Sequence, residues 1–296
     1  MYNGCVKHRL SCNFCQRQKL KLKHSFPTYS IVECENCKFI YRDKIFSQKE
    51  DAALYDKTYY LDLQKAYFNT CLEPNPKDKF RLDDFENRID LLETFYGSKK
   101  LRILDIGCGT GAFGYLARQR LHKTKGVEIS TFAQKIATSK FNEDVYRGEI
   151  TDKNFKKEKI DVVTLWESIA NIENTPELLA TVYKLLPKKG KIAILTTVVD
   201  SWLYFLAEAI NKISFGKINY FIQEGYPIHH ANHFTRKSLK KILKKYGFKI
   251  IYQKDLEIPY KYTKLPKIFY PALITLGQIA KFLNITIQTL ILAEKS

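Results

Sequence analysis

The chain has 296 residues, a hydrophobic fraction of 45% and a formal net charge of +18 at pH 7. It is longer than a usual single domain and apolar enough for a sizeable core, so we expect a core domain with an appendage. No run of 18 uninterrupted apolar residues occurs, which excludes a transmembrane helix. The basic excess is either a solvated surface or favours phosphate-bearing partners such as nucleic acid, an anionic membrane or a phosphorylated carrier.

Four cysteines near the N-terminus form two pairs. Cys12 and Cys15 make one C-x₂-C pair, and Cys34 and Cys37 make a second after 18 intervening residues. This spacing is typical of structural zinc, because two thiolates three residues apart fit the bite of one tetrahedral ion. No apolar leader segment opens the chain, so we expect reduced thiols and a cytoplasmic location rather than disulfides. The pattern predicts a zinc ribbon over residues 1–45.

Residues 46–78 are predicted to link this ribbon to the next part of the chain. Ser47–Tyr60 is predicted to be helical, whereas Pro74 and Pro76 interrupt the chain because each removes a backbone donor and restricts its predecessor. A helix is predicted over Phe80–Tyr96, where apolar residues recur at helical spacing. Three aromatic rings of the linker form either a lid or a packed segment: Tyr55, Tyr59 and Tyr60.

The run LRILDIGCGTG, from Leu101 to Gly111, carries most of the information about function. Its apolar residues predict a strand, and its glycines predict a tight turn into a helix over Phe113–Gln119. Glycines at such a turn let backbone N–H groups approach a ligand without a Cβ in the way. The order Asp-x-Gly-x-Gly-x-Gly differs from the G-x-G-x-x-G spacing of dinucleotide folds. Asp105 at the strand end would repel a pyrophosphate but suits a ligand with an ammonium group.

S-adenosylmethionine is such a ligand, and the chain resembles the class I S-adenosylmethionine-dependent methyltransferases from about residue 85 to 296. A second strand is expected over Lys125–Ile129. Near its end, Glu128 occupies the position at which members of the family have a carboxylate that binds both ribose hydroxyls. The loop Arg147–Ile150 matches the family's adenine-binding loop. The resemblance implies these cofactor-binding residues: Asp105, Gly107, Cys108, Gly109, Gly111, Glu128, Ile129, Glu149, Ile150 and Trp166. Cys108 is expected to be a small packing side chain rather than a nucleophile.

The same resemblance implies an α/β fold over residues 79–296, with a seven-stranded Rossmann-like sheet covered by helices on both faces. Its fourth to seventh strands are expected over Asp161–Trp166, Lys191–Thr197, Lys249–Gln253 and Thr289–Glu294. The last helix is expected over Ser238–Tyr246, with its apolar residues toward the core and its lysines in water.

An aromatic insertion at about residues 200–234 is expected either to cover the methyl-acceptor site or to pack in the core. It ends near His230, which occupies the place of a histidine in zinc-ribbon methyltransferases of polysaccharide and natural-product pathways. A neutral imidazole there would accept a hydroxyl proton, and a cap on the next helix is the alternative role. The Glu-His pair that the family has after strand four is missing here. Glu167 is the carboxylate nearest to that position, and we retain it as a catalytic candidate.

The apolar stretch Leu265–Leu283 is too short to cross a bilayer. It is predicted either to form a helix packed on the core or to lie in a membrane interface, at the inner face of the membrane, which would suit a lipid-linked substrate.

The leading hypothesis is methyl transfer from S-adenosylmethionine to a hydroxyl of a sugar, glycan precursor or related small or lipid-linked metabolite. RNA methylation is the alternative, because the basic surface and the ribbon also resemble some ribosomal RNA guanine methyltransferases. Against it, the residues after Cys37 lack their Gly-Tyr stretch, and no Asn/Asp-Pro-Pro-Tyr motif follows strand four. The missing Glu-His pair leaves a non-catalytic adaptor as a third hypothesis.

Overall fold

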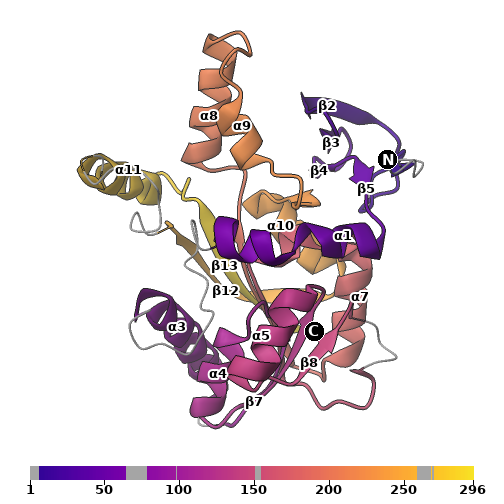
Figure 1. Cartoon of the computed structure of the whole chain (residues 1–296), viewed down its shortest axis with the longest axis vertical. Helices are drawn as coiled ribbons and strands as arrows, with labels where there is room; N and C mark the ends of the chain where they lie inside the picture. Colours follow the sequence, from indigo (N-terminus) through magenta and orange to yellow (C-terminus); the bar gives the residue numbers. More distant parts are fainter. Residues whose placement is uncertain (1–6, 65–78, 98, 151–154, 259–267, 269) are drawn as a thin grey trace.

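The computed structural model describes residues 7–64, 79–97, 99–150, 155–258, 268 and 270–296. Two small antiparallel sheets organise the N-terminal ribbon (Figure 1). Their strands are β1 (Lys7–His8) with β5 (Lys44–Ile45), and β2 (Leu20–Ser25), β3 (Ser30–Cys34) and β4 (Ile40–Arg42). A strand from far along the chain, β11 (Asn232–His233), pairs antiparallel with β4 and completes the second sheet. The ribbon and the end of the aromatic insertion therefore share one hydrogen-bonded sheet.

A seven-stranded sheet forms the centre of the molecule, as the sequence predicts. Its strands are β6 (Arg102–Ile106), β7 (Lys123–Glu128), β8 (Val145–Arg147), β9 (Val162–Trp166), β10 (Lys191–Thr197), β12 (Phe248–Leu256) and β13 (Gln288–Lys295). Their order is β12-β13-β10-β9-β6-β7-β8, and β13 runs antiparallel to both of its neighbours. The other pairings are parallel, so the carboxyl ends of β6, β7, β9 and β10 meet at one edge.

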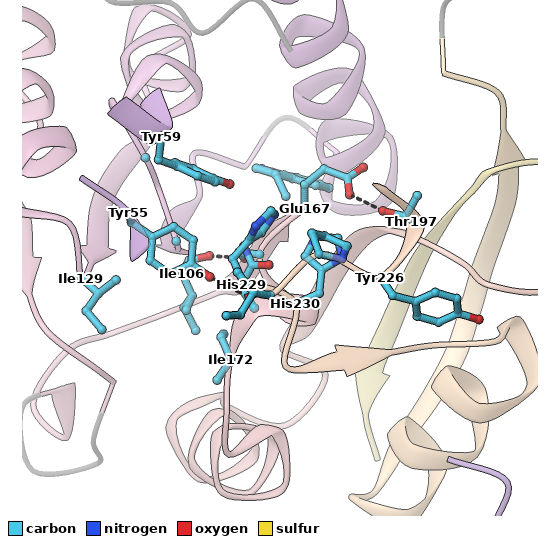
Figure 2. Close-up of a pocket in the computed structure, with 18 of the residues that line it drawn as sticks. Tyr55, Tyr59, Ile106, Ile129, Glu167, Ile172, Thr197, Tyr226, His229 and His230 are labelled. Carbon is cyan, nitrogen blue, oxygen red and sulfur yellow. Dashed lines mark hydrogen bonds between the residues drawn. The ribbon is translucent and has the colours of Figure 1, made fainter. Parts of the chain in front are cut away.

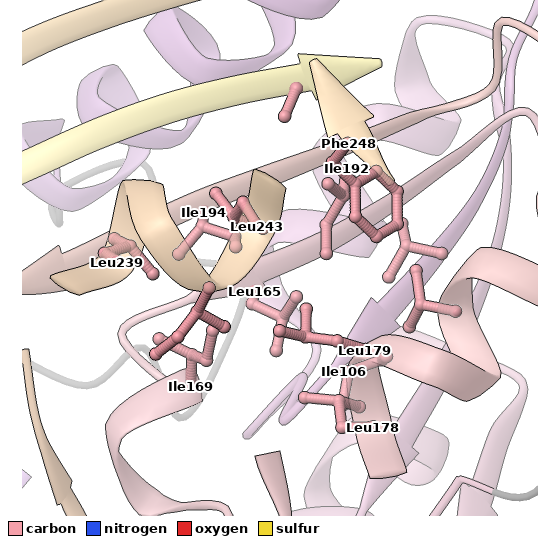
Figure 3. Packing of buried hydrophobic residues seen from close by; sticks show 14 of the residues in the cluster. Ile106, Leu165, Ile169, Leu178, Leu179, Ile192, Ile194, Leu239, Leu243 and Phe248 are labelled. Carbon is pink, nitrogen blue, oxygen red and sulfur yellow. The ribbon is translucent and has the colours of Figure 1, made fainter. Parts of the chain in front are cut away.

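Helices cover both faces of this sheet (Figure 1). They are α3 (Lys79–Tyr96), α4 (Ala112–Gln119), α5 (Thr131–Phe141), α7 (Thr175–Leu185) and α10 (Arg236–Lys245). Successive side chains of a strand point to opposite faces of the sheet, so β10 contributes residues to two separate cores. Ile192 and Ile194 pack with Leu179 and Leu243 in one core (Figure 3), whereas the next residue along, Ala193, belongs to the core under α3 and α4.

The basic helix has the predicted two-sided pattern in α10. Leu239 and Leu243 are fully buried, whereas Lys241 and Lys244 are exposed. The helix begins with a capping box, in which the Thr235 side chain accepts a hydrogen bond from the backbone of the third helical residue.

Shorter helices surround the carboxyl edge of the sheet. They are α1 (Gln48–Leu54), the π-helical turn η1 (Tyr59–Gln64), the 3₁₀ turn η2 (Ile169–Asn171), α8 (Trp202–Ile213), α9 (Tyr220–Gly225) and α11 (Tyr270–Phe282). The helix predicted over Ser47–Tyr60 is thus divided into α1 and η1. Ser47 begins α1 through a capping box with Glu50.

The tail helix α11 projects from the body of the molecule (Figure 1). Of its described residues only Gly277 and Ala280 are buried, so packing on the core accounts for a narrow strip of its surface. Within the described part of the chain, no helix has both the length and the apolar character needed to cross a bilayer.

Candidate active site

A cavity of about 910 Å³ lies at the carboxyl edge of the central sheet. Ligands of open α/β sheets bind at this edge, and the volume is at the upper end for small-molecule sites. Its wall combines three parts of the chain: the glycine loop after β6, the linker tyrosines, and the insertion with its two histidines (Figure 2). Such a volume leaves room for a cofactor and a second molecule.

The glycine loop forms one wall of the cavity and adopts left-handed backbone angles. Gly107 and Gly109 have φ values of 72° and 56°, which glycine adopts without steric cost. A Cβ at Gly107 would lie 2.5 Å from the Cβ of Ser168, so no larger residue fits there. Gly111 is different, because it is the N-cap of α4 and lies outside the cavity lining, where a Cβ would meet Ala137.

The Cys108 side chain packs within this loop. A Cβ built at Gly126 would lie 2.5 Å from the Cys108 Sγ, so the thiol fills the space above that glycine. Burial raises the pKa of the Cys108 thiol well above its usual value, and the neighbouring Glu128 and Asp105 carboxylates raise it further. The thiol is therefore protonated at neutral pH, which agrees with a packing role.

Glu128 lies on the cavity wall at the end of β7, and backbone donors hold its carboxylate. The Gly109 N–H donates to Oε2 at 2.9 Å, and the Ser130 N–H donates to Oε1 at 2.8 Å. Burial raises its pKa, while these backbone donors lower it. The glycine loop and the acidic residue of the second strand are thus joined directly. The proposed role of Glu128 in holding ribose hydroxyls stays a prediction.

Asp105 is buried at the end of β6 and also lines the cavity. The Thr164 hydroxyl donates to its Oδ1 at 2.6 Å. Burial raises the pKa of Asp105 to about 7, against the lowering effects of Thr164 and of the Arg88 charge. A cationic ligand in the cavity would stabilise the carboxylate form of this residue.

The remaining predicted cofactor residues are all part of the cavity wall. They are Ile129, Glu149, Ile150 and Trp166. Trp166 is buried at the end of β9 and packs edge-on against Phe113, with ring centroids 5.3 Å apart. The Glu149 side chain is exposed at the rim of the cavity.

The linker tyrosines and the insertion histidines meet in another part of the cavity wall (Figure 2), and Tyr60 lies against Gly109 of the glycine loop. The Tyr55 hydroxyl donates to the carbonyl of His229 at 3.0 Å, and the Tyr59 and His229 ring centroids are 5.3 Å apart. The rings of Tyr55, Tyr59 and Tyr60 are buried around Ala133, so this described part of the linker packs in the wall. His229 was not among the predicted site residues, and only its place beside His230 pointed to it.

His230 lines the cavity between two other imidazoles. Its ring centroid is 4.7 Å from that of His229 and 5.8 Å from that of His233. Burial lowers the pKa of His230 well below 6.5, and the neighbouring histidines and Arg42 lower it further. The imidazole is therefore neutral at pH 7, and its lowered pKa makes it a weaker base than a solvent-exposed histidine.

Glu167 follows β9 and faces the same cavity, with a left-handed φ of 60°. The Gln288 side-chain amide donates to one carboxylate oxygen, and the Thr197 hydroxyl donates to the other at 3.5 Å (Figure 2). These two partners come from β13 and β10. The carboxylate is therefore oriented by the central sheet.

Glu173 connects the cavity to the ribbon, and sequence patterns did not indicate it. It lines the cavity and pairs with Arg9 and Arg42 of the ribbon, both of which have buried side chains. Removing one partner of such an ion pair is strongly destabilising, because the other charge is then left buried without a partner. These ion pairs connect the ribbon to the wall of the cavity.

The four ribbon cysteines have the geometry of a closed metal site. Their Sγ atoms all lie within 4.8 Å of one another, and Cys12–Cys37 and Cys15–Cys34 are each 3.4 Å apart. Tetrahedral zinc with bonds near 2.3 Å places thiolate sulfurs about 3.8 Å apart, so the four residues fit this ion. Both C-x₂-C turns contain a left-handed residue, Gln16 and Lys38, whose N–H bonds the carbonyl of the first cysteine at 2.8 Å.

A cavity at the carboxyl edge of a seven-stranded α/β sheet is typical of enzymes that bind a cofactor or substrate there. A family model described as a methyltransferase domain matches residues 70–253, more than half of the chain, so the chain belongs to this family. Among curated proteins, none matches the chain in sequence.

Solved structures agree in fold. A SAM-dependent methyltransferase from Archaeoglobus fulgidus has a TM-score of 0.55 and 22% identity, and the match covers 80% of this chain and 100% of that one. Magnesium protoporphyrin IX methyltransferase from Synechocystis PCC 6803, solved with bound SAH, has a TM-score of 0.53 and 13% identity, covering 84% and 100%. Geranyl diphosphate C-methyltransferase from Streptomyces coelicolor A3(2) has a TM-score of 0.51 and 15% identity, covering 71% and 79%.

Proposed function

We propose that this enzyme transfers a methyl group from S-adenosylmethionine to a hydroxyl of a sugar, glycan precursor or related small or lipid-linked metabolite. The observation that carries the proposal is the cavity itself. One part of its wall is a glycine loop bonded to the carboxylate of Glu128, and another part presents neutral histidine. The first part suits the donor, and the second suits a hydroxyl acceptor.

The donor is proposed to lie along the glycine loop. Glu128 is assigned to the two ribose hydroxyls, Asp105 to the ammonium group, and Glu149 with Ile150 to the adenine. The position of Asp105 supports its part, because it is a buried carboxylate that lines the cavity at the start of the glycine loop. Gly107 and Gly109 leave space for the donor to approach the backbone.

In the proposed reaction, a lone pair of the acceptor oxygen forms a bond to the methyl carbon while the sulfur–methyl bond breaks. The electron pair of that bond returns to sulfur, which becomes neutral. The acceptor hydroxyl then loses its proton, and the imidazole of His230 is the candidate base. Glu167 is the second candidate, because its oriented carboxylate faces the same cavity. In-line positioning supplies most of the rate, so loss of the base slows the reaction without abolishing it.

We also propose that the ribbon cysteines hold one structural zinc ion. The donor set supports it, because four thiolates in a closed arrangement are typical of structural zinc. Such an ion leaves no open coordination position, so its part is to hold the ribbon and, through β4 and β11, the acceptor wall.

Calorimetry with S-adenosylhomocysteine tests the donor half of the proposal. Micromolar binding by the full chain supports it, and absence of binding at millimolar concentration contradicts it. Incubation with a labelled methyl donor and a cell extract tests the acceptor half. Label in a glycan or small metabolite supports the proposal, whereas label in RNA establishes the alternative of RNA methylation.

A further inference from the structure

The apolar wall of the cavity continues onto the outer surface of the molecule. Four side chains both line the cavity and are more than 40% exposed: Leu203, Leu206, Phe221 and Leu276. The first three come from α8 and α9, and the last comes from α11. These residues form the mouth of the cavity, so an apolar group inside the cavity has a continuous apolar path to the outside.

Beyond the mouth, the α8–α9 side presents further large apolar residues to solvent. These are Phe205, Ile213, Phe215, Ile218 and Tyr220, each at least half exposed. Phe215 is 92% exposed and has a φ of 52°. A left-handed φ is unfavourable for a bulky residue, and an aromatic ring that stays in water contributes no hydrophobic free energy to folding. The residue just after α8 therefore has an aromatic ring that does not contribute to the packing of the folded chain.

The α11 side has the same character. Ile274, Ile279, Phe282 and Leu283 are between 40% and 85% exposed, and Lys281 is the one charged residue of α11. Figure 1 shows α8 and α9 at the end of the molecule away from α4 and β7, and α11 projecting from one side. Exposed apolar surface on this scale marks an interaction site.

Basic side chains border this apolar surface. Lys212, Lys217 and Lys281 are exposed on the same elements. Lys23 and Lys212 lie with Phe215 around one shallow depression between the ribbon and α8. Two acidic residues lie on α8 and α9: Glu208, which is paired with His24, and Glu224. Apolar residues beside lysines, on a chain of net charge +18, complement an anionic lipid surface.

We propose that α8, α9 and α11 dock the enzyme on an anionic membrane surface, and that its acceptor is an amphiphile whose hydrocarbon chain leaves the cavity through this mouth. The acceptor's polar head lies near His230, and its chain runs past Leu206 and Leu276 into the lipid. This inference rests on the proposed function for the reaction and deepens it by naming the acceptor class. The docking surface itself does not depend on catalysis.

Vesicle flotation of the full-length enzyme tests the docking surface. The enzyme is expected to float with vesicles of equimolar phosphatidylcholine and phosphatidylglycerol, and less with phosphatidylcholine alone. Phe215→Asn should weaken this binding about tenfold, because one aromatic ring no longer enters the lipid. Lys212→Gln and Lys217→Gln should each weaken it about fivefold. Asparagine tolerates the left-handed angle, so the Phe215 variant is expected to fold normally.

Leu121→Asn is the matched control. Leu121 is 71% exposed and has a φ of 66°, and it follows α4 at the other end of the molecule. This variant should bind vesicles like the wild type. Equal binding by the Phe215 and Leu121 variants, or no flotation of the wild type with either vesicle, overturns the proposal.

A second copy of the chain is the competing occupant. A wild-type dimer that Phe215→Asn and Phe282→Ser convert to a monomer, with unchanged flotation, also overturns docking on lipid.

For the acceptor, the labelled methyl group is expected in the organic phase of an extracted reaction, and label confined to the aqueous phase contradicts an amphiphilic acceptor. Binding of S-adenosylhomocysteine without flotation refutes only this inference, whereas flotation without that binding refutes the proposed function and leaves the docking surface standing.

Discussion

The Tyr55 hydroxyl donates a hydrogen bond of 3.0 Å to the backbone carbonyl of His229. The backbone carbonyl of Tyr55 in turn accepts a hydrogen bond of 2.5 Å from the Ser130 hydroxyl, next to Glu128. One linker residue therefore joins the wall assigned to the donor to the wall assigned to the acceptor. Under the proposed function, this connection would set the spacing between the donor and the acceptor.

Tyr55→Phe should lower kcat/KM for the acceptor about fivefold, because one buried hydrogen bond of roughly 1 kcal/mol is lost. Affinity for S-adenosylhomocysteine should stay within twofold of the wild type. Tyr96→Phe is the control, because its hydroxyl also donates to a carbonyl, that of Asp161, but outside the cavity. A similar loss of turnover in both variants would show a general stability effect.

Glu128→Gln should weaken binding of S-adenosylhomocysteine by about ten- to a hundredfold, since hydrogen bonds to a charged acceptor contribute about 1.5–3 kcal/mol. Titration calorimetry measures the change. Glu158→Gln is the control, because Glu158 forms an exposed ion pair with Lys125 away from the cavity. Unchanged affinity in the Glu128 variant would remove this residue from the proposed donor site.

One zinc ion per chain is expected by metal analysis, and Cys15→Ser should release most of it. Acceptor turnover should fall with the zinc, because β4 of the ribbon pairs with β11 beside the histidines. Binding of S-adenosylhomocysteine should persist, since the glycine loop belongs to the central sheet. Cys108→Ser lies outside the ribbon and should retain the metal. Full turnover by the zinc-free chain would contradict the coupling.

Stability should depend on pH through the buried histidines. Burial lowers the pKa of His229 to about 4 and that of His233 to about 3. The unfolded chain therefore binds more protons than the folded one between these values and about pH 6.5, so the free energy of unfolding falls as pH falls through that window. The raised pKa values of Asp51 and Asp105, both about 7, act in the opposite direction below neutrality.

His233→Phe isolates one of these groups. Relative to the wild type, it should lose about 2 kcal/mol less between about pH 7.5 and pH 5, when the free energy of unfolding is measured with urea. The wild type and the variant share the other titrating groups, and those that do not interact with His233 cancel in the comparison. Parallel pH profiles would mean that His233 does not titrate as a buried neutral group.

The central sheet could be predicted from the sequence because its signals are local. The apolar residues and the glycines of Leu101–Gly111 specify a strand, a turn and a helix within a few residues, and a resemblance then supplies the later strands along the chain. The same local spacing marks the four cysteines. The zinc itself, the domain boundaries and the roles of the site residues remain predictions.

The acceptor wall could not be predicted in the same way. The pairing of Arg42 with Glu173 and the bond from Tyr55 to His229 join residues more than a hundred positions apart. No local pattern encodes such contacts, because each depends on how the ribbon, linker and insertion pack together. The aromatic insertion illustrates this, since Tyr204 is buried whereas Phe215 is exposed.

The sequence by itself determined the fold class, the methyltransferase resemblance and the candidate metal ligands, since short-range spacing and periodicity carry that information. Only the tertiary structure decided which side chains face the cavity, which apolar residues remain exposed around its mouth, and how the ribbon is fastened to the acceptor wall. The physical reason is that burial and long-range pairing are properties of the packed chain. Residues of the same type in the same segment can therefore differ in their burial and in their partners.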